Sequence, residues 1–575
     1  MLRRIFSYSG KYKKYFILAA LCITAESLFE LLIPLIMADI VDIGVANGDK
    51  AYIFSRGGFM ILCALLALLL GIGSARFAAI AGQGLGANLR EAEYAKLQEF
   101  SFANVDHFQI SSLVTRMTGD VTNIQNSISS GMRPACRGPV MLVAATGVAF
   151  SINGKLAVVF LIALPVLALC LGTIIVKVRP LYGKMQEAVD LVNRIIQENL
   201  TAVRVVKAYV RGKYEIGKFG DVNTNLQTHS ERAFRLATTN MACMQFVMYA
   251  TIISILWFGG GMIRVGSMQV GELTGFLSYV LQILNSLMMI SNIFLMLTRS
   301  LASAKRIAEV LDEEIDITEE KAEDIEVERG EIEFSHVFFK YKKEAKEYVL
   351  SDINLHIYPG QTVGIVGQTG SAKTTLVQLI PRLYDATEGE VLIDSRPVNR
   401  YPLKNLRDSI SMVLQNNTLF SGTLRDNLLW GDKDASQEEI EEACRIAGAD
   451  EFIDRLPEGF DTEMGQGGVN VSGGQKQRIC IARAVLKKPK VLILDDSTSA
   501  VDMATEAGIR EQLAEKLPGM TKIIIAQRIS SVRHADRIIV LEDGKIMGSG
   551  THEELLSGNE IYREIYESQK EGAEL

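Results

Sequence analysis

Residues 367–375 read GQTGSAKTT, with glycines, a lysine and two threonines at the spacing of a phosphate-binding loop. The segment follows an apolar β-type run at 362–366 and precedes a helical segment at 376–383, which is the context such a loop needs. Its glycines let backbone N–H groups turn toward phosphate oxygens, and the helix N-terminus adds partial positive charge. We expect Lys373 to contact the β- and γ-phosphates of a bound nucleotide and the Thr374 hydroxyl to ligate Mg²⁺. The predicted ATP-binding residues of the loop are Gly367, Gln368, Thr369, Gly370, Ser371, Ala372, Lys373, Thr374 and Thr375.

One position of this loop departs from the pattern G-x-x-x-x-G-K-[ST], because Ala372 stands where the last glycine is expected. Alanine adopts only negative φ without strain. A site that needs a positive φ there would bind less well, whereas a site with negative φ would accept alanine without loss. We expect the second case, in which Ala372 is harmless.

A second chemical element follows at Val491–Asp496, where four apolar residues end in two carboxylates. This pattern predicts a buried strand that ends at a metal-facing acid, and Asp495 would hold Mg²⁺ through water.

The seven cysteines include no Cys-x-x-Cys pair, which argues against a zinc site or a disulfide framework. We expect them to be buried, reduced thiols.

The N-terminal half contains apolar runs of the length that crosses a bilayer as a helix. The first run continues from Tyr15 to about Ile40, which is too long for a signal peptide. The third is the weakest, because Arg137 lies near its start. The six predicted spans are about Tyr15–Ile40, Gly57–Ile80, Val140–Ile152 (extended backward towards Pro134), Leu156–Val178, Cys243–Ile263 and Leu273–Leu297.

Positive charge is distributed unevenly among the loops. The leader before the first span and the loop between the fourth and fifth spans are rich in Lys and Arg, whereas the short loops on the other side carry only Lys50, Arg56, Lys155 and Arg264. The positive-inside rule therefore predicts that both termini are cytoplasmic. The net charge of −7 gives no support for nucleic-acid binding.

Two predicted cytoplasmic connections, at about 84–134 and 179–238, are long and rich in helix-forming residues. A hairpin with arms of ~25 residues would reach on the order of 37 Å. The midpoints lie near Gln109–Arg116 and Ala202–Val210, and we expect these tips to dock on the soluble domain. The alternative is a pair of solvated hairpins with no partner.

The segment Val471-Ser472-Gly473-Gly474-Gln475, called here the signature segment, lies between the phosphate loop and the acidic strand. With it the chain resembles the ATP-binding-cassette exporters, whose signature is L-S-G-G-Q. The resemblance covers essentially the whole chain and implies a six-helix membrane domain with cytoplasmic helical extensions, followed by an α/β nucleotide-binding cassette. The expected domains are residues 1–310, a linker at 311–328, and a cassette at 329–575. It also implies that two such chains pair, with each ATP between one phosphate loop and the other chain's signature.

Further positions match the family residue by residue. Tyr341 matches the aromatic residue that stacks on adenine, and Gln415 matches the glutamine that senses Mg²⁺ and contacts the membrane domain. Residues 462–467 match the short loop before the signature. Asp502 lies in the run 499–502 that matches the loop crossing to the opposite site.

Two positions that carry chemistry in this family differ here. Asp496 stands where the family has its catalytic glutamate, and Gln527 stands where it has a histidine. Asp is one methylene shorter, and a misplacement on the order of 1 Å can reduce a rate ~10²-fold. Gln can donate a hydrogen bond but carries no positive charge for the transferring phosphoryl group. The pattern resembles the degenerate subunit of heterodimeric exporters; tolerated drift in a homodimer is the alternative.

The transported compound is less well defined by the sequence. Glu26 and Glu30 lie one turn apart in the first span, where ionisable groups usually face a bundle interior or a cavity. A cation site and interhelical pairing are both open. Flexible methionines suit promiscuous binding, although lipid-facing packing explains the same residues. The family resemblance implies multidrug-type export of small lipophilic compounds across the cell membrane, with peptides, lipids, or an ATP-gated channel or sensor as alternatives. The apolar residues concerned are Met241, Met244, Phe246, Met248, Tyr249, Met288, Met289, Phe294 and Met296.

Overall fold

The computed structural model describes residues 2–342, 344–497 and 500–571. The chain divides into two compact units, which are described separately. The first unit comprises Met1–Gln98 and Ile110–Glu313, and the second comprises Glu99–Gln109 and Glu314–Leu575.

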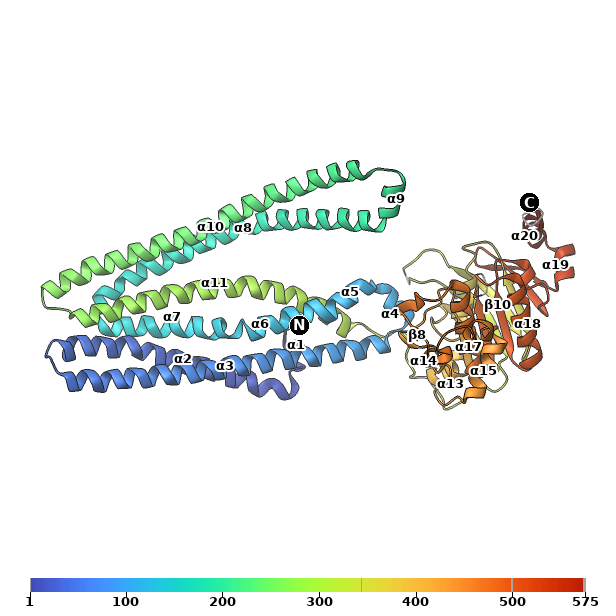
Figure 1. Ribbon diagram of the computed structural model, residues 1–575, viewed down its shortest axis with the longest axis horizontal. Coiled ribbons are helices and arrows are strands. Elements are labelled where there is room, and N and C mark those ends of the chain that lie inside the picture. Colours follow the sequence, from blue (N-terminus) through green and yellow to red (C-terminus); the bar gives the residue numbers. More distant parts are fainter. Residues whose placement is uncertain (1, 343, 498–499, 572–575) are drawn as a thin grey trace. The chain divides into compact units, whose positions relative to one another are not determined.

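The first unit consists of helices, because long apolar runs must satisfy their backbone groups within each segment (Figure 1). Asn153 accepts a hydrogen bond from the Leu156 N–H and so caps the helix that follows. The helices are α1 (Leu2–Ser7), α2 (Lys13–Asp39), α3 (Lys50–Glu99), α5 (Ile110–Thr115), α6 (Val121–Ser129), α7 (Met132–Ile152), α8 (Gly154–Thr201), α9 (Val203–Ala208), α10 (Gly212–Arg264) and α11 (Val270–Asp312), with the short 3₁₀ helix η1 (Gly10–Tyr12) and the π-helical segments η2 (Ile40–Val45) and η3 (Arg116–Asp120).

Five described helical stretches are long and apolar enough to cross a membrane: Gly10–Val45, Lys50–Glu99, Ile110–Ile152, Gln245–Arg264 and Val270–Ile290. They contain the predicted first, second and third spans and most of the fifth and sixth. A shorter apolar helix, Gly154–Cys170, covers the start of the predicted fourth span. The side chains of Leu171, Ile174 and Ile175 in that span lie outside the described residues.

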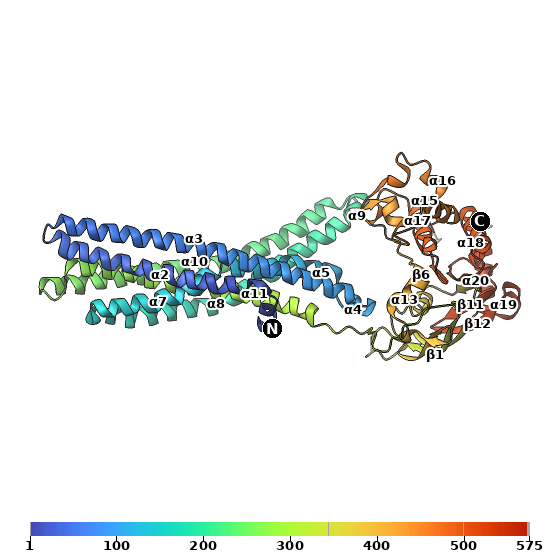
Figure 2. The same ribbon diagram turned by 90° about the horizontal axis from the view of Figure 1, so that it is seen from below.

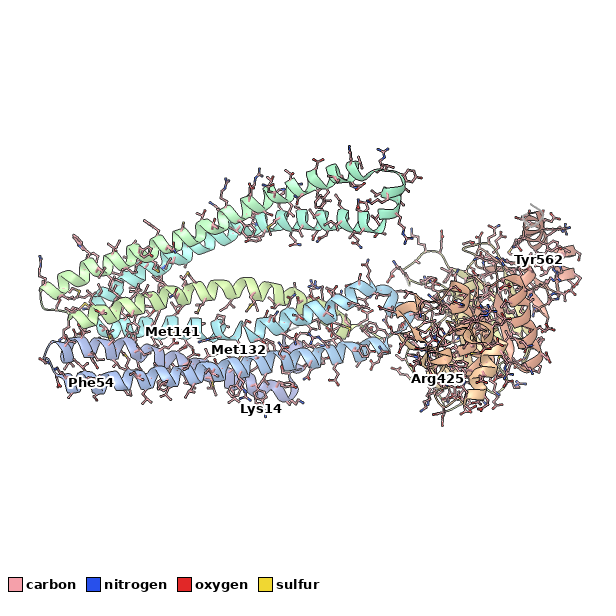
Figure 3. All side chains as sticks on the ribbon, viewed as in Figure 1. Lys14, Phe54, Met132, Met141, Arg425 and Tyr562 are labelled. Carbon is pink, nitrogen blue, oxygen red and sulfur yellow. The ribbon has the colours of Figure 1, made fainter. Side chains whose placement is uncertain are left out.

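Helices α8 and α10 pack along each other and are joined by α9, so that residues 154–264 form one long hairpin (Figures 1 and 2). α9 lies within the predicted tip Ala202–Val210. The membrane-type core gathers residues of several helices, among them the buried Phe160 of α8, Phe276 of α11 and Met141 of α7, which Figure 3 labels.

The second unit is an α/β domain together with α4 (Phe102–His107). Its strands are β1 (Ile332–Phe339), β2 (Leu350–Ile357), β3 (Thr362–Val366), β4 (Glu388–Ile393), β5 (Arg396–Pro397), β6 (Ile410–Val413), β7 (Gly422–Thr423), β8 (Glu463–Met464), β9 (Val491–Asp495), β10 (Thr521–Ile525), β11 (Arg537–Glu542) and β12 (Lys545–Gly550). Its other helices are α12 (Lys373–Gln378), α13 (Leu403–Ser409), α14 (Leu424–Leu428), α15 (Gln437–Ile446), α16 (Asp450–Ile453), α17 (Gly473–Leu486), α18 (Met503–Lys516), α19 (His552–Gly558) and α20 (Glu560–Glu571), with turns η4 (Val398–Arg400), η5 (Gly459–Asp461), η6 (Gln466–Gly468) and η7 (Ile529–Ser531).

The strands form a six-stranded sheet in the order β12-β11-β3-β10-β9-β6, a four-stranded antiparallel sheet in the order β2-β1-β4-β5, and the small pair β7-β8. In the larger sheet β11, β3, β10, β9 and β6 are parallel, and β12 pairs antiparallel with β11. Ile525 pairs with both Ile365 and Asp495. The residues that follow β3, β9 and β10 therefore meet at the carboxyl edge of the sheet, where open α/β sheets bind ligands.

The short helix α4 modifies the prediction for the first cytoplasmic hairpin. The segment that joins the cassette unit is Glu99–Gln109, whereas the predicted tip Gln109–Arg116 lies almost entirely in α5 and the first unit. The segment that joins the cassette unit thus precedes most of the predicted tip, because α3 ends at Glu99 and the two arms of the connection differ in length. Ser101 and Asn104 form a capping box that starts α4.

Candidate functional site

The phosphate loop wraps around the ammonium group of Lys373. Lys373 Nζ donates hydrogen bonds of 2.8 Å to the carbonyl oxygens of Gly367 and Gln368, and one of 3.3 Å to Ser371 Oγ. Burial lowers the pKa of Lys373, and the nearby carboxylates of Asp496 and Asp495 oppose this shift. Helix α12 begins at Lys373, three residues before the predicted helical segment. The lysine thus stands at the helix N-terminus, as phosphate binding requires.

The backbone at Ala372 contradicts the expectation that no positive φ is needed there. Ala372 has φ +70° and ψ +24°, in the left-handed region. An alanine in this conformation stores strain on the order of 1 kcal/mol. The loop keeps the shape that a glycine would adopt, so the substitution places a conformational cost on the site.

Thr374 and Asp495 meet at the position predicted for the metal. Thr374 Oγ1 donates a hydrogen bond of 3.0 Å to Asp495 Oδ1. Asp495 is 1 % exposed, and its buried Oδ2 has no hydrogen-bond partner among the described residues. Burial raises the pKa of Asp495, as does the Asp496 charge, whereas the Thr374 hydrogen bond and Lys373 lower it. A hydroxyl and a buried carboxylate oxygen suit a hard divalent cation, so these residues fit Mg²⁺.

Asp496 and Gln527, the two positions expected to differ from the family pattern, contact each other. Gln527 Nε2 donates a hydrogen bond of 2.8 Å to Asp496 Oδ2. Burial raises the pKa of Asp496, and the hydrogen bond from Gln527 and the Lys373 charge oppose this. Asp496 has φ +48°, so its side chain leaves a strained backbone at the end of β9.

A cavity of about 270 Å³ joins these groups. Val349 and Ile525 also line it, and neither was predicted, because an apolar residue on a strand has no distinguishing sequence signal. Gly367 and Gln368 contribute through their bonds to Lys373. The predicted residues among its lining are Thr369, Gly370, Ser371, Ala372, Lys373, Thr374, Thr375, Gln415, Asp495, Asp496 and Gln527.

Tyr341 lies next to this cavity, with its side chain partly accessible. The residue is 45 % exposed, and its hydroxyl and Thr375 Oγ1 share a hydrogen bond of 2.8 Å. An exposed aromatic ring that is anchored at its tip suits stacking with a planar base.

The signature segment lies on other elements, and the described lining of the cavity does not include it. Ser472 caps α17 by a capping box with Gln475, and Val471 packs against the domain core. A Cβ on Gly473 would lie an ordinary 3.6 Å from Ala500 Cβ, whereas one on Gly474 would lie 2.8 Å from the Ala500 carbonyl oxygen. Asp502 caps α18 by accepting from the Thr505 N–H at 2.9 Å. Ser472 and Gly473 are exposed.

Glu26 and Glu30 of α2 form ion pairs with α7. Arg133 contacts Glu26, and Arg137 contacts Glu30, with Arg137 Nη1 at 3.1 Å from Glu30 Oε1 and 3.4 Å from Glu26 Oε1. These contacts support the interhelical-pairing alternative, since a cationic ligand would have to displace a guanidinium group.

The methionine-rich positions have mixed environments. Met248 packs against the membrane-type core, whereas Phe246 and Tyr249 are exposed. The side chains of Met241, Met244 and Phe294 lie outside the described residues.

Two models of known protein families match this chain, one over its helical part and one over its α/β part. A family model described as the ABC transporter transmembrane region matches residues 16–287, and one described as ABC transporter matches residues 350–499. The chain is 39 % identical over its full length to the uncharacterized ABC transporter ATP-binding protein YfiB of Bacillus subtilis (strain 168), and it covers 100 % of that protein. It is 30 % identical to the putative multidrug export ATP-binding/permease protein YgaD of the same organism, over 98 % of this chain and 99 % of that one.

The solved structure of a bacterial Atm1-family ABC exporter with ATP bound has the same fold, with a TM-score of 0.80 and 23 % identity over 99 % of this chain and 98 % of that one. A membrane domain followed by an ATPase cassette, together with the full-length relatives, makes this chain an ATP-driven exporter subunit that belongs to the ABC transporters.

Proposed function

We propose that this chain is the degenerate-site subunit of a heterodimeric exporter. Its own nucleotide site would bind MgATP and hydrolyse it slowly, and its signature segment would complete the catalytic site of a partner chain. The observation that carries the proposal is the contrast within one cavity. Lys373, Thr374 and Asp495 keep the binding chemistry, while Asp496 and Gln527 bond to each other.

Binding and turnover depend on different groups of this cavity. The loop N–H groups and Lys373 hold phosphate oxygens in the ground state, and Mg²⁺ would be held by Thr374, Asp495 and Gln415. Turnover also needs a group that positions the attacking water and a cation near the transferring phosphoryl group. Asp496 is one methylene shorter than glutamate, and the neutral Gln527 supplies no charge. Turnover should therefore suffer more than binding.

A partner chain is supported by the exposed signature. Ser472 and Gly473 stand at the N-terminus of α17, where the backbone N–H groups favour an anion such as a nucleotide phosphate. We place the pair in the cell membrane with both termini and the cassettes in the cytoplasm, on the basis of the loop charges.

The transported compound is proposed to be small and lipophilic. The similarity to a putative multidrug exporter supports this class, as do the methionines of α10 and α11. Methionine side chains adapt to ligands of different shapes.

The test uses the full-length chain in nanodiscs, without a partner. We expect MgATP to bind while hydrolysis stays far below the roughly 1 s⁻¹ or more of a working enzyme. The Lys373→Ala variant is the binding control, because it removes the phosphate contact. ATPase at the rate of an active exporter would show a working homodimer instead. An ATP-dependent ion current, without transport against a gradient in vesicles, would show a channel.

A further inference from the structure

Four aromatic rings connect the nucleotide cavity with α4 inside the cassette unit. The ring centroids of Tyr341 and Tyr384 are 5.2 Å apart, and the two ring planes make an angle of 86°. The Phe339 ring lies edge-on to both, with its centroid 4.9 Å from that of Tyr341 and 5.6 Å from that of Tyr384. The Phe102 ring of α4 lies 6.0 Å from Tyr384. Edge-to-face pairs have a preferred geometry, so the orientation of one ring restricts the next.

The far end of this series is a hydrogen bond to α4. The Tyr384 hydroxyl donates to Asp106 Oδ2 at 2.6 Å, which is a charge-assisted contact. Tyr384 is 8 % exposed, and burial, followed by the Asp106 bond, raises its pKa, so the hydroxyl keeps its proton and remains a donor. Asn104 Nδ2 also donates to the Glu314 carbonyl at 2.8 Å, which ties α4 to the start of the cassette segment.

The near end of the series is tied to the phosphate loop. The Tyr341 hydroxyl bonds Thr375 Oγ1, and Thr375 follows directly after the metal-binding Thr374. Tyr341 is therefore held at its tip by α12 and at its edge by Tyr384, while 45 % of the residue stays exposed for a base.

We propose that Tyr384 is a positioning residue that couples a base on Tyr341 to α4. The inference rests on the proposed role of Tyr341 as the adenine platform. A stacked base holds the Tyr341 ring in the orientation that meets Tyr384 edge-on, and this favours the Tyr384 orientation that bonds Asp106. α4 follows α3 (Lys50–Glu99) in the chain, so a base bound at Tyr341 would also influence a helix of the membrane domain.

The alternative is that Tyr384 only packs α4 onto the cassette. Coupling between two sites is reciprocal in free energy, so the two roles differ in a measurable way. If the base strengthens the Tyr384–Asp106 bond, removal of that bond must weaken the binding of a ligand with a base. It must leave a ligand without a base unaffected.

The experiment compares MgATP with magnesium tripolyphosphate on the full-length chain in nanodiscs. Tyr384→Phe keeps the ring and removes the hydroxyl, and Asp106→Leu removes the acceptor from the other side. We expect each variant to weaken ATP binding about 3- to 10-fold, with no change for tripolyphosphate, and the double variant to match the single ones. Tyr401→Phe is the matched control, because it removes a buried hydroxyl that donates to the Ile393 carbonyl at 2.8 Å.

A second measurement follows α4 itself. In the unmodified chain, ATP but not tripolyphosphate should slow amide hydrogen exchange at residues 101–107, and Tyr384→Phe should abolish the difference. Equal effects of the variants on both ligands, or no effect on either, would overturn the coupling. If the unmodified chain binds ATP no more tightly than tripolyphosphate, the base platform on Tyr341 is wrong, and the coupling fails with it. If the unmodified chain binds ATP more tightly than tripolyphosphate, but amide hydrogen exchange at α4 is the same with both ligands, the coupling alone is refuted.

Discussion

The Gln527 side-chain amide donates a hydrogen bond of 2.8 Å to the Asp496 carboxylate, and this joins the two residues on which the proposed degeneracy of the nucleotide site rests. The contact follows from the sheet. Strands β9 and β10 are parallel with Asp495 opposite Ile525, so the residues just after each strand lie side by side. We therefore expect Asp496 and Gln527 to affect hydrolysis as a pair.

Restoring both groups should raise hydrolysis. With a partner whose signature is intact, Asp496→Glu with Gln527→His should increase turnover at this site by about 10- to 100-fold, because the longer carboxylate reaches the water and the histidine supplies charge. Nucleotide trapped during turnover identifies the site: the unmodified chain should retain ATP at Lys373. ADP at Lys373 with ATP at the partner's site would contradict the proposed asymmetry. If the partner's signature is also altered, the double change should have little effect.

The signature should act on the partner's site. Gly473→Gln should abolish ATPase of the assembled pair, whereas Asp496→Asn should leave much of it. A Cβ at Gly473 would lie 3.6 Å from the nearest atom of its own chain, which is an ordinary van der Waals contact. A loss of activity in Gly473→Gln would therefore report on contact with the nucleotide of the opposing site. Gly508→Ala, with nothing within 4 Å of the added atom, controls for a general effect of substitution. Equal losses for Gly473→Gln and Asp496→Asn would remove the distinction between the two sites.

The strain at Ala372 should be relieved by glycine. Ala372→Gly should increase the free energy of unfolding by up to about 1 kcal/mol, because the left-handed conformation is no longer strained by a Cβ. The extra conformational entropy that glycine loses on folding offsets part of this gain. Ala372→Val should act in the opposite direction. Thermal unfolding with and without ATP measures both, and destabilisation by Ala372→Gly would mean that the backbone there is not strained.

The ion pairs between α2 and α7 should stabilise the membrane domain. Arg137→Leu leaves Glu30 without the guanidinium that pairs with it and leaves the buried Glu26 with Arg133 alone, and we expect the free energy of unfolding to fall by about 2–3 kcal/mol. Glu30→Leu with Arg137→Leu should recover part of this. Melting temperatures in nanodiscs give the comparison, with Lys218→Ala, from the exposed pair with Glu198, as the control that should not change. If Glu30 instead binds a transported cation, Glu30→Gln should remove transport without lowering the melting temperature.

Labelling should establish the orientation of the α8–α10 hairpin. In a background without the seven native cysteines, Tyr209→Cys should react with an impermeant maleimide only in inside-out vesicles, because the exposed tip is expected in the cytoplasm. Ser267→Cys, in the turn between α10 and α11, should react only from the outside of cells. The reverse pattern would invert the topology.

The sequence by itself determined the parts whose chemistry is local. The phosphate loop, the acidic end of β9 and most of the long apolar helices depend on residue types at short spacing. The buried β3 and β9 consist largely of apolar residues, so their strand character also shows in the sequence. The family resemblance then predicted roles for Gln415, Gln527 and the signature segment, which no local pattern distinguishes.

Tertiary structure decided the features that depend on register and packing. The strain at Ala372 appears only once the loop has closed around Lys373. The Gln527–Asp496 bond requires two strands to align, and the Tyr384–Asp106 bond joins residues 278 positions apart. Hydrophobic periodicity specifies an element and its buried face, but it carries no information on which element lies opposite. That choice is made by close packing of the whole unit, where each side chain must fill a volume shared with residues from distant parts of the chain.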